Sequence, residues 1–200
     1  MHRRRHVVTA LLVAAACLAA TSAPLVGATI PLRRLPPSDR DAIAAIFDPA
    51  LARLGLRVTR AELEKPPQYT SDPHGDHLAV YVEPIGDSTA ATYLTNLSKV
   101  AKVFLPTVFD RWKGLRSFDV CQEPLPSIDA SPEPPPVTQL AVSRRAAGKI
   151  NWRETTLAKL VALQEPRRGP RRLPATDFNV YLDRELLTQP AYRQALEERP

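Results

Sequence analysis

Residues 77–112 have the sequence HLAVYVEPIGDSTAATYLTNLSKVAKVFLPTVFDRW. The first seven residues of this stretch are rich in β-branched and aromatic side chains, and Pro84 and Gly86 follow them, which predicts a strand that ends at a turn. Apolar residues then recur every three or four positions, which predicts a long helix with one buried side. That apolar side consists of Tyr93, Leu97, Val100, Phe104 and Val108. Pro106 is expected to bend this helix or to end it early.

Similar patterns extend outward from this stretch. We predict helices beginning at Ser38, Asn151 and Arg184, with Asn151 and Glu154 forming a capping box. Further strands are predicted at 56–63, 116–121, 137–143 and 178–182. The order of elements predicts an α+β fold: a mainly antiparallel sheet of four or five strands with helices packed on one face. One domain, residues 38–200, would hold all of these elements.

Residues 122–136 form a proline-rich loop within this domain. They contain six prolines and three acidic residues in fifteen positions, with no basic residue. Such a segment adopts extended conformations and cannot build a core. It is either a ligand for a groove on another envelope protein or a stiff surface connection.

The N-terminal residues 1–28 have the pattern of a secretory signal peptide. A basic head precedes 14 mainly apolar residues, 7–20, whereas a helix needs about 20 such residues to cross a bilayer. Val26-Gly27-Ala28 is the preferred cleavage site, which leaves residues 29–37 as a linker. We therefore expect a protein that is secreted or held in the cell envelope, and its Arg, Pro and Ala bias indicates a bacterial origin.

Three other interpretations of this segment stay open. Cys17 follows three alanines and is a candidate lipid-attachment residue, which would make the chain an anchored lipoprotein. Arg4-Arg5 loosely matches the twin-arginine export pattern. The segment would otherwise remain as an uncleaved anchor.

The net charge changes once the signal peptide is taken into account. The chain of 200 residues is 44% hydrophobic and 24% charged, which is typical of a soluble globular protein, and has a formal charge of +6. Residues 1–28 contain three arginines and no acid, so the exported part has a charge of only +3. No nucleic-acid partner is expected from so small an excess.

The only dense polar cluster is the stretch 72–77, DPHGDH. Asp72, His74, Asp76 and His77 are weak candidate metal ligands, because imidazole and carboxylate groups suit zinc and similar ions. The two histidines are three positions apart in a Pro/Gly loop and lack a third histidine. A polar turn with solvated imidazoles is the competing interpretation.

No established catalytic motif accompanies this cluster. The sequence has no nucleophile elbow, phosphate loop or dinucleotide fingerprint, so no catalytic residue and no cofactor are predicted. Cys121 lies in an apolar run and is expected to be a buried strand residue, with a reactive thiol as the alternative.

Two basic stretches complete the inventory. Arg167, Arg168, Arg171 and Arg172 are weak candidates for contact with an anionic envelope component or a membrane surface. Arg144, Arg145 and Lys149 are predicted to lie in an exposed turn. The sequence as a whole favours an exported binding module. A small metal-dependent hydrolase using residues 72–77 and a lipid-anchored accessory protein are the alternatives.

Overall fold

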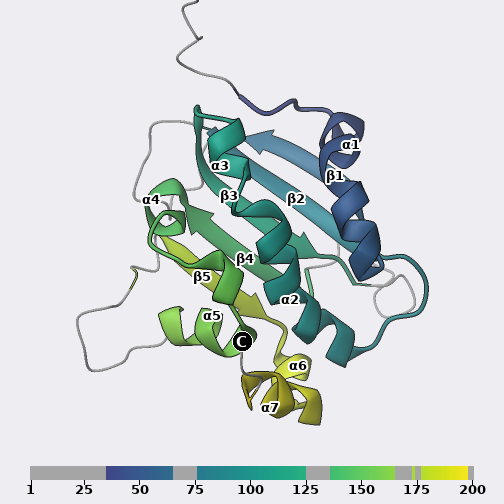
Figure 1. The fold of residues 1–200 in the computed structure, drawn as a ribbon. Helices are drawn as coiled ribbons and strands as arrows, with labels where there is room; N and C mark the ends of the chain where they lie inside the picture. The colour runs from purple at the N-terminus through teal and green to yellow at the C-terminus, as the bar shows by residue number, and fades with distance from the viewer. Residues whose placement is uncertain (1–34, 65–75, 125–135, 165–172, 174–176, 198–200) are drawn as a thin grey trace, which may run out of the picture. The chain divides into compact units, whose positions relative to one another are not determined.

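The fold is built on a five-stranded sheet whose strands are neighbours in chain order (Figure 1). The computed structural model describes residues 35–64, 76–124, 136–164, 173 and 177–197, all within the compact unit Pro31–Pro200. The strands are β1 Leu56–Glu64, β2 Asp76–Pro84, β3 Leu115–Gln122, β4 Thr138–Ser143 and β5 Phe178–Leu182. The predicted α+β class is confirmed. The sheet is mixed, because β2 and β3 are parallel and the other three pairs are antiparallel.

The parallel pair follows from the long helix between β2 and β3. Parallel neighbours need a crossover of a dozen or more residues, and α2 (Ala90–Phe104) provides it. Thr89 caps this helix by accepting a hydrogen bond from the Thr92 amide. Pro106 ends the helical run early, and a separate turn, α3 (Val108–Arg111), follows it.

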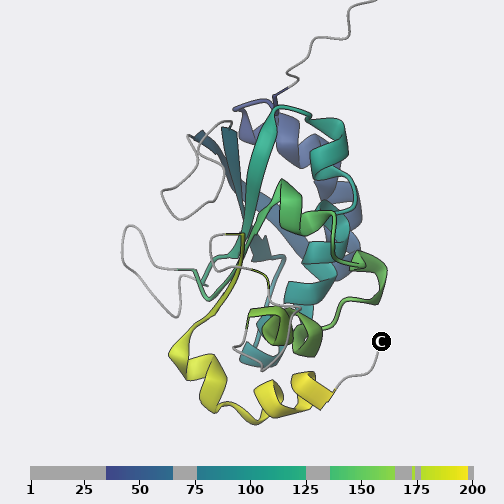
Figure 2. The same ribbon diagram turned by 90° about the vertical axis from the view of Figure 1, so that its left-hand side faces the viewer.

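The main helices cover one face of the sheet (Figure 2). These are α1 (Arg40–Leu51), α2, α3, α4 (Arg144–Ala147) and α5 (Leu157–Gln164). Two short helices, α6 (Arg184–Thr188) and α7 (Pro190–Glu197), follow β5, and Pro190 begins the second of them. Among the described residues, no helix is both long enough and apolar enough to span a membrane.

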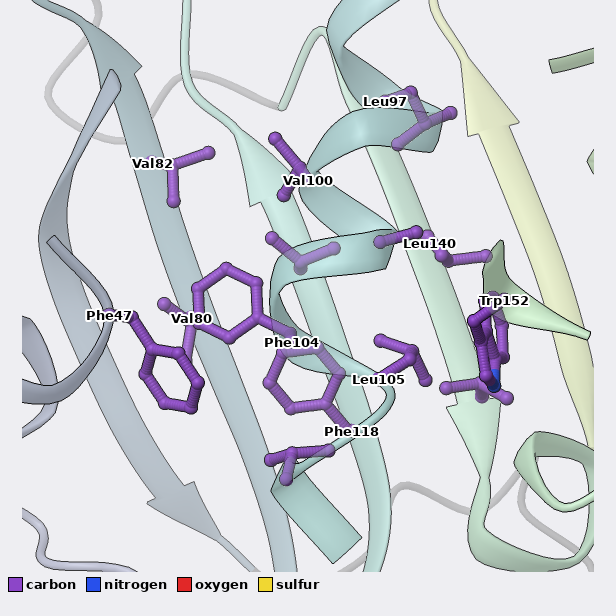
Figure 3. Packing of buried hydrophobic residues seen from close by; sticks show 14 of the residues in the cluster. Phe47, Val80, Val82, Leu97, Val100, Phe104, Leu105, Phe118, Leu140 and Trp152 are labelled. Carbon is purple, nitrogen blue, oxygen red and sulfur yellow. The ribbon is translucent and has the colours of Figure 1, made fainter. Parts of the chain in front are cut away.

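The core lies between the sheet and this helix layer (Figure 3). The Phe104 ring of α2 is fully buried, with its centroid 4.4 Å from that of Phe47 in α1 and 5.3 Å from that of Phe118 in β3. Three aromatic rings therefore join two helices to the centre of the sheet.

Helix boundaries depart from the sequence analysis at two places. α1 begins at Arg40 rather than at Ser38, and the side chain of Asp39 caps it by accepting a hydrogen bond from the Asp41 amide. The predicted capping box at Asn151 is wrong: its side chain forms no capping hydrogen bond to the short 3-10 turn η2 (Trp152–Glu154). The helix that follows, α5, instead has the Thr156 hydroxyl accepting from the Lys159 amide at 3.3 Å.

Side chains from the helix layer bind backbone groups of both outer strands. In β1, the Val58 amide donates to Asp48 Oδ1 and the Val58 carbonyl accepts from Arg40 Nη2, each at 2.8 Å. In β5, the Val180 amide donates to Gln164 Oε1 at 2.6 Å. Each edge of the sheet thus has at least one residue whose backbone is already bonded.

Candidate functional site

Polar and titratable side chains cluster on the sheet face opposite the helices. Residues alternate between the two faces of a strand, and the core takes Leu78, Val80 and Val82 of β2. His77 therefore lies on the helix-free face, where the strand register pairs it with Ser117. Asp119 and Cys121 follow Ser117 at intervals of two on the same face.

A buried polar network links three strands on this face. His77 Nδ1 lies 2.8 Å from Ser117 Oγ, and His77 Nε2 lies 3.7 Å from Asp119 Oδ2. The side-chain Nε2 of Gln139, in β4, donates to the same Asp119 oxygen at 2.6 Å. His77, Ser117 and Asp119 are each no more than 3% exposed. These bonds satisfy buried polar groups and fix the register of β2, β3 and β4.

The residue types resemble a nucleophilic triad, but the geometry favours a structural role. A substrate carbonyl must reach the serine oxygen, and Ser117 is only 2% exposed. The His77–Asp119 separation is also longer than a hydrogen bond. Burial lowers the pKa of His77 to about 4, so the ring is neutral at pH 7 and its contact with Asp119 is not an ion pair.

The buried neutral ring predicts a stability that falls with acid. The unfolded ring titrates near its ordinary pKa of about 6.5, so between pH 6.5 and 4 the unfolded chain binds more protons. Above pH 6.5 the neutral ring makes its full contribution to the free energy of unfolding. About 2 kcal/mol of that free energy should be lost by pH 5, and about 3 kcal/mol once the pH falls below 4. Urea unfolding at pH 7, 6 and 5 measures this loss. His77→Gln should be nearly flat between pH 6.5 and 5, and an unchanged slope in that variant would contradict the assignment.

The structure brings together only part of the predicted metal cluster. Asp72 and His74 lie outside the described residues. Asp76 and His77 are the first residues of β2, and the His77 ring is buried against Ser117 rather than solvated as in the polar-turn interpretation. Within the described ranges, no group of three or more His, Cys, Asp or Glu side chains is placed to bind a metal ion. The metal site stays a prediction.

The two cysteines have different outcomes. Cys17 lies outside the described residues, so lipid attachment stays a prediction. Cys121 is buried in β3, as predicted, and is 2% exposed. Burial is the main cause that raises the pKa of the Cys121 thiol well above its ordinary value, and the nearby Asp119 carboxyl adds to the increase. The thiolate is therefore scarce at neutral pH.

Charge is strongly segregated along the chain. Residues 99–116 and 144–159 together contain ten basic and two acidic residues, a net charge of +8. The remaining described residues contain six basic and fourteen acidic residues, a net charge of −8. A formal charge of zero over the described part therefore conceals two regions of opposite sign.

The two basic segments meet in space through Arg144 at the start of α4. Its guanidinium donates to the carbonyls of Phe109, Trp112 and Leu115 at 2.9, 2.7 and 2.8 Å. It also lies over the Phe109 ring, 5.1 Å from the centroid. One half-buried arginine thereby ties α4 to the α3–β3 turn. Burial lowers the pKa of Arg144 from its ordinary value, but not enough to remove its charge.

The remaining cations of these segments are largely exposed and form what we call the basic surface. It contains the exposed residues Lys99, Lys102, Arg111, Lys113, Arg145, Lys149, Arg153 and Lys159. They come from α2, α3, α4, η2 and α5 and from the turns that follow α3 and α4, and α2 contacts both η2 and α5. Lys113 and Arg145 are paired with Asp110 and Asp177, respectively.

Sequence reasoning overlooked this surface. The predicted exposed turn at Arg144, Arg145 and Lys149 is wrong for Arg144, which is half-buried and begins a helix. The four arginines at 167–172 lie outside the described residues, so their predicted role is not tested. Summing charge over segments rather than over the whole chain would have detected the asymmetry.

Comparisons with protein-family models, with curated proteins and with solved structures gave no match.

Proposed function

We propose that the protein is an exported protein of the bacterial cell envelope that acts by binding an anionic envelope component through the basic surface. The observation that carries this proposal is the segregation of charge, +8 in two adjoining segments against −8 in the rest of the described chain. Such an asymmetry attracts and orients an anionic partner even when the total charge is small. Binding, rather than catalysis, is the activity that the exposed residues support.

Export rests on the N-terminal sequence pattern. Cleavage after Ala28 would give a mature chain that begins at Thr29, whereas lipid attachment would give one that begins at a diacylated Cys17. Mass spectrometry of the mature N-terminus separates these routes. An intact N-terminus at Met1 in the cytosolic fraction would contradict export.

The binding proposal is tested with two triple variants of equal net charge. Lys113→Gln/Lys149→Gln/Arg153→Gln removes three cations of the basic surface. Arg57→Gln/Arg60→Gln/Arg184→Gln removes three exposed cations elsewhere, of which Arg57 and Arg60 lie on the helix-free face. Binding to immobilised polyphosphate in about 0.1 M salt should weaken roughly 100-fold in the first variant, if each cation contributes about 1 kcal/mol.

The second variant is the matched control and should bind within about threefold of the native chain, because its cations lie outside the basic surface. Equal weakening of the two variants would mean that only total charge matters. That result would contradict a defined surface, as would failure of the native chain to bind.

A further inference from the structure

We infer that the anionic component is the head-group surface of a lipid membrane, on which the protein docks with its helix layer towards the lipid. This inference rests on the proposed function and names its partner. It is carried by the placement of the eight exposed cations on one side of a two-layer domain and by a group of four acids on the other side.

The two lysines of α2 show that the basic surface points away from the sheet. Lys99 and Lys102 are exposed, while Leu97, Val100 and Phe104 of the same helix are buried against the sheet. The two lysines therefore lie on the side of α2 that points away from the sheet. The helices α3, α4 and α5 lie on the same side of the sheet (Figure 2). The cations of the basic surface are thus distributed over one broad side of the domain.

A planar partner fits this distribution better than a linear or a small one. The eight exposed cations come from five helical elements and two turns, and they do not converge on one point. A single polymer strand would contact only one line of them, whereas a sheet of lipid phosphates can meet many at once. Each cation close to such a surface increases binding about fivefold.

The helix-free face of the sheet carries an acidic group that disfavours docking on an anionic membrane. Glu62 and Glu64 of β1 pair with Ala79 and His77, which places them on the helix-free face. Glu83 and Glu123 lie nearby, in contact with Arg57 and with Thr59 and Arg60, respectively. Among the described residues of this region, four carboxyl groups stand against two guanidinium groups, and anionic lipid would repel this excess of negative charge. The charge pattern therefore selects one orientation.

The test is co-sedimentation of the full-length chain with vesicles. Vesicles of pure phosphatidylcholine are compared with vesicles that contain 30% phosphatidylglycerol, for the native chain and for the two triple variants. The apolar N-terminal residues are common to all three proteins, so their contribution cancels in the comparison. We expect anionic vesicles to bind the native chain at least tenfold more tightly than neutral vesicles. We expect a loss of about 100-fold in the basic-surface variant and less than threefold in the control.

Each outcome decides between the claims. Equal binding to the two kinds of vesicle, or equal loss in the two variants, would overturn membrane docking. A third outcome is that polyphosphate binding is weakened only in the basic-surface variant while the native chain shows no preference for anionic vesicles. That outcome would overturn membrane docking but leave the proposed function intact. Failure to bind either probe would overturn both. Binding to anionic vesicles that disappears in 0.5 M salt would support docking through charge.

Discussion

Phe104→Ala is expected to lower the free energy of unfolding by about 4 kcal/mol, the largest effect of any single substitution considered for this chain. The ring is 0% exposed and touches both Phe47 and Phe118, so its removal leaves a cavity between two helices and the sheet. The loss combines the transfer free energy of the ring with the cost of that cavity. Urea-induced unfolding followed by circular dichroism measures it.

Val103→Ala is the matched control for this prediction. Val103 precedes Phe104 in α2 but is only partly buried at the margin of the core. Its truncation should cost about 1 kcal/mol. Similar losses in the two variants would show that Phe104 does not connect the helix layer to the sheet as described.

Arg144→Ala should be the second most damaging change, with a loss of about 3 kcal/mol. The substitution leaves the carbonyls of Phe109, Trp112 and Leu115 without their common donor and removes the stacking on Phe109. Arg144→Lys should recover little, because one ammonium group cannot reproduce the planar fork of the guanidinium. Thermal or urea unfolding of the two variants tests this.

Lys149→Ala separates this structural role from loss of charge. Lys149 is exposed at the end of the same helical region, so its removal should change stability by less than about 0.5 kcal/mol. A fully stable Arg144→Lys variant would contradict the argument, since charge alone would then hold α4 on the α3–β3 turn.

The elements of the fold were largely predictable because they depend on local patterns. The apolar period from Tyr93 to Val108 and the alternation around Val80 each identify their element without reference to the rest of the chain. Cap positions were less predictable, because Thr89, Ser88 and Asp87 are all suitable residues and only the geometry of the turn selects Thr89. The four-residue helix at Arg144 has too short a pattern to detect.

The candidate site was less predictable because it depends on strand order. His77 and Ser117 are 40 positions apart, and only the parallel pairing of β2 with β3 brings them together. The same limit applies to the basic surface, since residues 99–116 and 144–159 are brought together by tertiary contacts, among them the hydrogen bonds of Arg144. A sequence pattern indicates which residues share a strand or a helix, but not which distant segments become neighbours.

The bonded backbone groups at Val58 and Val180 would have a consequence if the protein gathers at an interface as proposed. Concentrating a sheet protein in two dimensions brings its outer strands close to those of other copies, and open strands can then pair. Here Asp48, Arg40 and Gln164 already occupy backbone groups of one residue in each outer strand. These bonds interrupt the run of groups that each edge offers to another copy, which disfavours polymerisation.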